Sequence, residues 1–152
     1  MKKLVSFLTA TALVATMMTT SSCTKTCDAG FEGSDCKTEM RTKFVNEPNG
    51  WSADETGSQS GHSAAYTVHI QTSSTAADKI RITNFWNNFV GDVTADVTTS
   101  TTFTIPSQRP DNDAYTVVSG TGTIANGVIT VAYSVSDTSN HTDVVAGTWT
   151  KK

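Results

Sequence analysis

All three leucines of the 152-residue chain, Leu4, Leu8 and Leu13, lie within its first 13 residues. From Cys23 onward the chain has no leucine and a single methionine, whereas the whole chain contains 28 threonines and 16 serines. Helical cores are built mainly from leucine, alanine, methionine and long charged residues, while threonine is a common strand residue. The distribution therefore excludes a helix bundle and predicts an all-β body.

The first 22 residues have the pattern of a secretory signal. Two lysines precede an apolar stretch over residues 4–18, which is too short to span a bilayer, and small polar residues follow it. The segment Thr20-Ser21-Ser22-Cys23 resembles a bacterial lipobox of the relaxed form found in the Bacteroidetes, with Thr20 where the strict pattern has leucine. This resemblance implies lipidation of Cys23. An ordinary cleaved signal, which would leave Cys23 as a free thiol, is the alternative.

Cleavage before Cys23 also changes the charge balance. The formal net charge of the whole chain is −3, and loss of Lys2 and Lys3 leaves 9 basic against 14 acidic residues. Because attraction to anionic headgroups or nucleic acid requires basic residues, we expect no nucleic-acid partner and membrane attachment through the N-terminal lipid alone. The expected location is the bacterial cell envelope, at the outer membrane.

A short cysteine-bounded segment follows. Once Cys23 is lipidated, Cys27 and Cys36 remain as one pair, and we expect them to form a disulfide. The segment between them reads C-x-x-G-F-x-G-x-x-C, and its two glycines can supply the positive φ angles of two tight turns. It resembles the closing half of an EGF-like module, without the other four cysteines. Such a hairpin is either a spacer or a protein-contact module.

The residues after this hairpin resemble the junction in small Bacteroidetes lipoproteins that join a partial EGF-like hairpin to a compact β-domain. The family is mostly uncharacterised, so the resemblance implies organisation and location without chemistry. The predicted division is a signal peptide over 1–22, the lipidated cysteine with its partial EGF-like hairpin over 23–40, and a β-barrel domain over 41–152.

The β-domain alternates strand and turn signals at short intervals. Asn126-Gly127 is a strong signal for a two-residue hairpin turn. With that turn, the register pairs Ala125 with Val128, Ile124 with Ile129, Gly122 with Val131, Gly120 with Tyr133, and Val118 with Val135. The eight expected strands lie near Trp51 and over 64–71, 79–85, 92–97, 101–105, 115–125, 128–136 and 143–150.

Strands joined by short turns favour an antiparallel up-and-down meander, and eight of them close into a small barrel. We expect the last strand, which ends near Trp149, to pair with the first near Trp51. In strand count the arrangement resembles the lipocalin or calycin architecture. An immunoglobulin-like β-sandwich is the alternative.

The sequence contains no recognisable catalytic or metal-binding motif. Residues 57–61 have Gln59 where a nucleophile elbow needs serine, and we interpret them as a mobile polar loop. The three histidines are far apart in the chain, and Asp111-Asn112-Asp113 lacks the further ligands of a calcium loop. We therefore expect no catalytic residues, no metal and no cofactor.

The candidate ligand-binding segment interleaves aromatic rings with amides. Rings stack on sugars or peptides while amides give directional hydrogen bonds. Alternatively, the rings plug one end of the barrel and the asparagines make turns. The residues are Phe85, Trp86, Asn87, Asn88 and Phe89.

We therefore expect a membrane-anchored, non-catalytic binding module for a small apolar molecule or a glycan. The alternative is a structural or protein-interaction lipoprotein of the cell envelope, with a filled barrel and no small-molecule ligand. A barrel interior filled by Tyr66, Phe103, Tyr133 and Trp149 would exclude a carrier.

Overall fold

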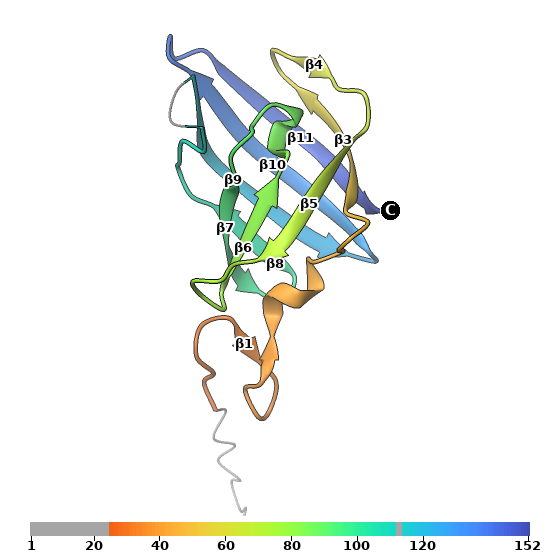
Figure 1. The fold of residues 1–152 in the computed structure, drawn as a ribbon, viewed down its shortest axis with the longest axis vertical. Helices are drawn as coiled ribbons and strands as arrows, with labels where there is room; N and C mark the ends of the chain where they lie inside the picture. The colour runs from red at the N-terminus through yellow and green to blue at the C-terminus, as the bar shows by residue number, and fades with distance from the viewer. Residues whose placement is uncertain (1–24, 112–113) are drawn as a thin grey trace, which may run out of the picture.

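The computed structural model describes residues 25–111 and 114–152 of the chain. Within them it has eleven strands, two short 3-10 helices and no α-helix. The expected lipidation residue, Cys23, and the predicted leader lie outside the described residues, as do Asn112 and Asp113. A small hairpin comes first along the chain, and a barrel follows it (Figure 1).

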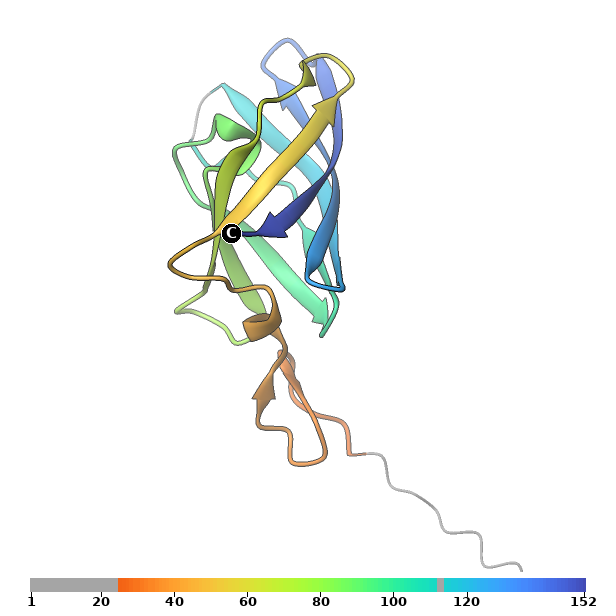
Figure 2. The ribbon, with the colours of Figure 1, turned by 90° about the vertical axis from the view of Figure 1, so that its right-hand side faces the viewer.

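Eight strands form the barrel, each antiparallel to its neighbours and following the last in chain order. The final strand pairs with the first over seven residue pairs, including Trp149 with Ala53, and this closes the barrel (Figure 2). The predicted all-β, up-and-down meander of eight strands is confirmed. The strands are β3 (Trp51–Gly57), β5 (Tyr66–Thr72), β6 (Lys79–Thr83), β7 (Val93–Thr99), β8 (Thr102–Ile105), β9 (Tyr115–Ala125), β10 (Val128–Asp137) and β11 (Thr142–Lys151).

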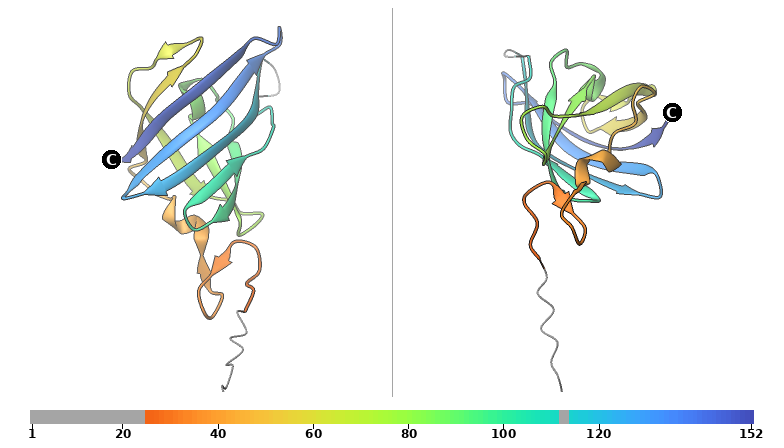
Figure 3. Two further views of the ribbon diagram at one scale, coloured as in Figure 1. Left: turned by 180° about the vertical axis from the view of Figure 1, so that it is seen from behind. Right: turned by 60° about the horizontal axis from the view of Figure 1, so that its bottom comes forward.

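The strands are long on one side of the barrel and short on the other. β9, β10 and β11 have 11, 10 and 10 residues and run side by side across the back of the molecule (Figure 3). Their outer faces carry mainly threonine and serine, while alternate side chains point inward. The barrel interior is filled by large side chains, among them the fully buried Trp51, Trp149, Phe44, Phe85 and Phe103.

The predicted β9–β10 hairpin is confirmed from its turn as far as Tyr133, which pairs with Gly120. The predicted pairing of Val118 with Val135 is wrong. A bulge between Ser134 and Val135 shifts the register, so that Val135 pairs with Val117, which is fully buried, while Val118 is exposed. A bulge moves alternate side chains to the opposite face, which explains the error.

Direct pairing between β3 and β5 stops early. The two strands pair only from Trp51 to Ala53, although β11 follows β3 as far as Gly57. The end of β3 instead pairs with the two-residue strand β4 (Gly61–His62). Beyond Ala53 the backbone of β3 bonds to Ser63, whose N–H donates to the Glu55 backbone oxygen at 2.9 Å, and to β4, which lies at the end of the barrel away from the N-terminal hairpin (Figure 2).

The N-terminal hairpin contains β1 (Phe31–Glu32), β2 (Thr38–Glu39) and the predicted disulfide between Cys27 and Cys36, which is confirmed. Gly30 and Gly33 have φ angles of 89° and 90°, as expected for the two turns.

The hairpin contacts the base of the barrel through a short 3-10 helix, η1 (Met40–Lys43). The guanidinium of Arg41 donates to the backbone oxygens of Ser73 and Ala76, at 2.6 and 2.7 Å, in the loop that joins β5 to β6. A Cβ on Gly30 would lie only 2.5 Å from the backbone of Ala77, so the two segments are in close contact. These contacts tie the hairpin to the barrel.

Candidate functional site

The aromatic segment predicted from the sequence closes one end of the barrel. It forms a second 3-10 helix, η2 (Phe85–Asn87), directly after β6. The buried Phe85 ring lies 4.3 Å from the Tyr133 ring and 6.2 Å from the Trp149 ring, between centroids, and Phe89 is 3 % exposed. Phe85 and Phe89 therefore plug this end of the barrel, as in the alternative interpretation of the aromatic segment.

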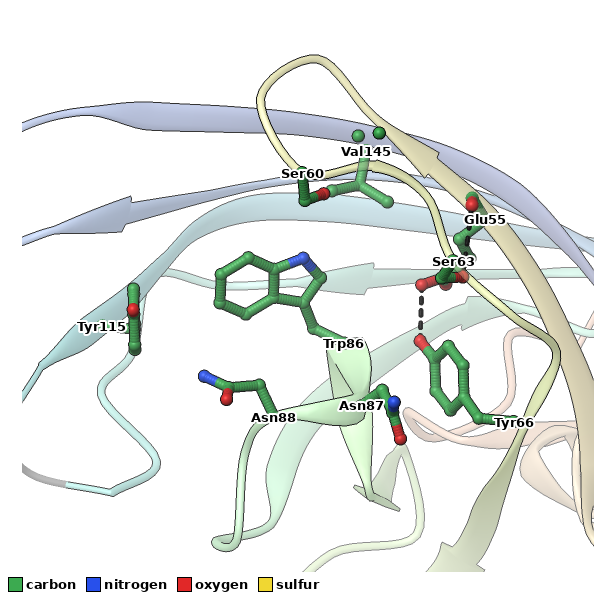
Figure 4. A pocket seen from close by; sticks show the side chains of 11 residues that line it. Glu55, Ser60, Ser63, Tyr66, Trp86, Asn87, Asn88, Tyr115 and Val145 are labelled. Atoms are coloured by element: carbon green, nitrogen blue, oxygen red, sulfur yellow. Dashed lines mark hydrogen bonds between the residues drawn. The ribbon is translucent and has the colours of Figure 1, made fainter.

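Trp86, Asn87 and Asn88 have a different position, because they line a cavity at the barrel mouth. Trp86 and Asn87 have φ angles of 57° and 50°, in the left-handed region that a bulky residue seldom adopts. This backbone turn sends the Trp86 indole into the cavity while the preceding phenylalanine points into the core (Figure 4). The carboxylate of Asp111 accepts from the backbone N–H groups of Val90 and Gly91 and holds the end of the loop.

The mouth cavity has a volume of about 260 Å³. It lies where the β3–β5 pairing is interrupted and is walled by aromatic rings, amides, hydroxyls and one carboxylate (Figure 4). Its lining residues are Glu55, Gly57, Ser60, Gly61, Ser63, Tyr66, Trp86, Asn87, Asn88, Tyr115 and Val145.

Trp86 and Tyr115, together with Ser60, also line a second cavity of about 240 Å³. Their ring centroids lie 5.2 Å apart with the rings nearly perpendicular, an edge-to-face contact that keeps both side chains in place. The second cavity is lined on its far side by Asp137, His141 and Asp143. Both rings therefore line both cavities.

Glu55 occupies an inward position of β3 and is 3 % exposed. Its carboxylate accepts hydrogen bonds from the hydroxyls of Tyr66 and Tyr133, at 2.5 and 2.7 Å, and from the indole nitrogen of Trp149, at 2.7 Å. All three donors are neutral, and Glu55 forms no salt bridge with any residue that the structure describes. A buried carboxylate in such a setting depends on these hydrogen bonds.

The same arrangement keeps the two tyrosines protonated. Burial raises the pKa of Tyr66 and of Tyr133 far above the ordinary tyrosine value, and the adjacent Glu55 carboxylate raises both further. Both hydroxyls are therefore protonated hydrogen-bond donors at neutral pH.

Asp143 holds the loop between β3 and β4. Its carboxylate accepts from the Ser60 hydroxyl at 2.6 Å and from the Gln59 backbone N–H at 2.8 Å. Burial alone would raise the pKa of Asp143, but hydrogen bonds from Ser60, Gln59 and Ser58 outweigh it and the pKa lies below the ordinary value. The loop over residues 57–61, which we predicted to be mobile, is therefore hydrogen-bonded to the barrel. The sequence could not predict these bonds, because it does not indicate which carboxylate faces the loop.

Of the five residues predicted from the sequence, Trp86, Asn87 and Asn88 line the cavity, whereas Phe85 and Phe89 do not. The other eight lining residues were missed, among them Glu55, Tyr66 and Tyr115. A signal for Glu55 exists in the alternation of strand β3, where Trp51, Ala53 and Glu55 share the inward face. A charged residue at an inward-facing strand position, as at Glu55, indicates a functional site. Tyr115 could not be found in this way because it lies at the start of its strand.

Among residues 25–111 and 114–152, no group of three or more His, Cys, Asp or Glu side chains could hold a metal ion. In the same part of the chain, no helix has the length and apolar character needed to cross a bilayer. Neither the family models nor the curated proteins compared with this sequence match it. The chain has an eight-stranded antiparallel β-barrel with a disulfide near its N-terminus, and the geometry of its mouth is the basis for assigning a function.

Proposed function

We propose that this protein is an exported lipoprotein of the cell envelope that binds a sugar unit of a glycan at the mouth of its barrel, without catalysis. The observation that carries the proposal is the mouth cavity, in which the Trp86 indole and the Tyr66 and Tyr115 rings lie beside the amides of Asn87 and Asn88. Aromatic faces stack on the apolar faces of sugar rings, and amides hydrogen-bond to hydroxyls.

The filled interior favours a glycan over an apolar ligand. Phe103 and Trp149 are fully buried and Tyr133 is 4 % exposed, so the space that an apolar molecule would need inside the barrel is occupied by side chains. A Cβ on Gly122 would collide with the Phe103 ring, so this ring fills even the space opposite a glycine. The space that remains is at the mouth, where polar side chains line it.

The position of the cavity fits a protein tethered at Cys23. The N-terminal hairpin lies at one end of the barrel, whereas η2 and β4 lie at the other (Figures 1 and 2). A lipid on Cys23 would therefore leave the mouth facing away from the membrane, with the hairpin as a spacer. The resemblance of the leader and hairpin to small Bacteroidetes lipoproteins supports the same organisation.

Binding is tested by titrating the mature barrel with a panel of monosaccharides and following heat or tryptophan fluorescence. W86A should abolish binding. The matched control is V90A, because Val90 belongs to the same loop, is 92 % exposed and lines neither cavity. Equal loss of binding in both variants, or sugar binding that persists in W86A, would refute the assignment to this cavity.

The lipid anchor is tested in a bacterial host that carries out lipobox processing. The wild-type chain should partition into the detergent phase and incorporate labelled fatty acid, and C23S should do neither. The control is S22A, which leaves the cysteine in place. Fatty-acid labelling that persists in C23S would contradict lipidation at Cys23.

A second candidate is a protein-interaction lipoprotein without a small ligand. One observation favours it: Val144 and Val118 are exposed on the outer sheet of β9–β11, and a groove of about 350 Å³ lies there. Under this candidate, surface changes such as V144D would prevent envelope complexes from forming, and W86A would have no effect.

A further inference from the structure

The buried carboxylate of Glu55 is the feature of the mouth cavity that neutral-sugar binding leaves unused. We propose, on the basis of the function above, that the ligand carries an ammonium group and that this group binds next to Glu55. An amino sugar with a free amine is the ligand class that combines both requirements.

The Glu55 carboxylate accepts fewer hydrogen bonds than it can. A carboxylate has about four acceptor sites, and three of them are occupied by Tyr66, Tyr133 and Trp149. Oε2 accepts from both tyrosines, whereas Oε1, among the residues that the structure describes, accepts from the indole alone. One acceptor site on Oε1 therefore remains, and Glu55 lines the cavity.

The charged groups around the mouth cavity are mainly carboxylates. None of the described residues that line the mouth cavity is a lysine, arginine or histidine. The neighbouring cavity adds two more carboxylates, Asp137 and Asp143, and one histidine. A ligand carboxylate or phosphate would therefore be repelled here, while a cation would be attracted by a negative charge that is screened little by water.

Of these three carboxylates, Glu55 is the one that lines the mouth cavity, whereas Asp137 and Asp143 line the neighbouring one. Asp143 is occupied by the loop donors Ser58, Gln59 and Ser60. Asp137 accepts from the backbone N–H groups of Ser139 and His141 and from the His141 ring. The carboxylate of Glu55 accepts from the cavity-lining Tyr66 and from the buried Tyr133 and Trp149, and Glu55 itself lines the cavity.

The aromatic walls add to this attraction. Trp86 and Tyr115 line the cavity with Tyr66, and the negative face of an aromatic ring attracts an ammonium group within about 6 Å. The combination of one desolvated carboxylate and several rings is suited to a primary ammonium. The amides of Asn87 and Asn88 are left to bind the hydroxyls of the sugar.

The test compares three sugars of one ring size on the wild-type protein: glucosamine, glucose and N-acetylglucosamine. Only the first carries a charge. Glucosamine should bind roughly tenfold more tightly than either of the others, and the preference should diminish at high salt. Equal binding of glucosamine and glucose would overturn the ammonium inference while leaving sugar binding intact. Failure of all three to bind would overturn both proposals.

A pair of variants locates the preference. E55Q should reduce the ratio of glucosamine to glucose affinity to about one. E47Q removes the same charge from a residue that lines neither cavity, so it should keep the wild-type ratio. A preference that persists in folded E55Q would overturn the role of Glu55. If E55Q does not fold, the comparison of the three sugars on the wild type still decides the inference.

One further probe separates the sources of the ammonium group. Methylammonium has the charge but no sugar ring, so it should compete with glucosamine only at much higher concentration. Competition at equal concentration would support a site for simple amines and would overturn the assignment to an amino sugar.

Discussion

The carboxylate of Glu55 and the indole nitrogen of Trp149 are 2.7 Å apart, joined by a hydrogen bond between the first and last strands of the barrel. The bond serves two purposes at once. It fixes the orientation of Glu55 in the lining of the mouth cavity, and it links the two strands whose pairing closes the barrel. Closure of the barrel and the proposed ligand recognition therefore involve the same pair of residues.

We expect W149F to destabilise the protein more than W51F. Both tryptophans are fully buried, but the Trp51 indole donates to the neutral backbone oxygen of Phe44, whereas the Trp149 indole donates to a carboxylate. Hydrogen bonds to charged groups contribute about 1.5–3 kcal/mol and neutral ones about 0.5–1.5 kcal/mol. Urea unfolding should show the difference, and a larger loss in W51F would contradict this role for Glu55.

Gly147 lies directly opposite Glu55 in the closing strand pair, and a Cβ there would lie 2.3 Å from the Asp54 backbone oxygen and 2.7 Å from the Glu55 Cγ. G147A should therefore cost about 1–3 kcal/mol of unfolding free energy and weaken the proposed ligand binding, because the β3 backbone at Asp54 and the Glu55 side chain must both move. The control is A146V, which adds more atoms at an exposed position of the same strand. If A146V costs as much as G147A, the close contact with Glu55 is not the cause.

Asp143 should make stability depend on pH in the acid range. Its folded-state pKa lies below the ordinary value of 3.8, so its contribution is present above 3.8 and is lost as the pH falls through the lower, folded-state pKa. The difference in unfolding free energy between the wild type and D143N should accordingly be largest near neutral pH and should shrink well below pH 3.8. A difference that stays constant with pH would show that the charge of Asp143 has no part in holding the β3–β4 loop.

Removing the disulfide should affect the hairpin and spare the barrel. A loop of about ten residues gains roughly 2–3 kcal/mol from such a bond, but the barrel closes through β3 and β11 without it. In the double variant C27S/C36S, hydrogen exchange should become faster for β1 and β2 amides, while β9–β11 stay protected. Faster exchange throughout the barrel would contradict this separation.

Much of the fold could be predicted because local chemistry and hydrophobic alternation agree. The Asn126-Gly127 turn set the register of β9 and β10 correctly as far as Tyr133. The prediction failed at Val135, where one extra residue in the opposite strand exchanges the faces, and no turn residue or composition signals such a bulge.

The site could be predicted only in part. The sequence indicated that the segment from Phe85 to Phe89 lies at one end of a barrel, but alternating rings and amides do not show which ring points inward. That depends on the left-handed backbone at Trp86 and Asn87. Glu55 was missed because its partners, Tyr133 and Trp149, are 78 and 94 residues away in the chain and meet it only once the barrel closes.

The most direct test of ligand binding at the mouth uses the three tryptophans of the chain as separate reporters. Their indole N–H signals can be followed by NMR while glucosamine is added to the mature protein. Trp86 lines the cavity and Trp149 contacts Glu55, whereas Trp51 is bonded to Phe44 near the base of the barrel. The Trp86 and Trp149 signals should shift and saturate, and the Trp51 signal should not. No shift at Trp86, or equal shifts at all three, would contradict binding at the mouth.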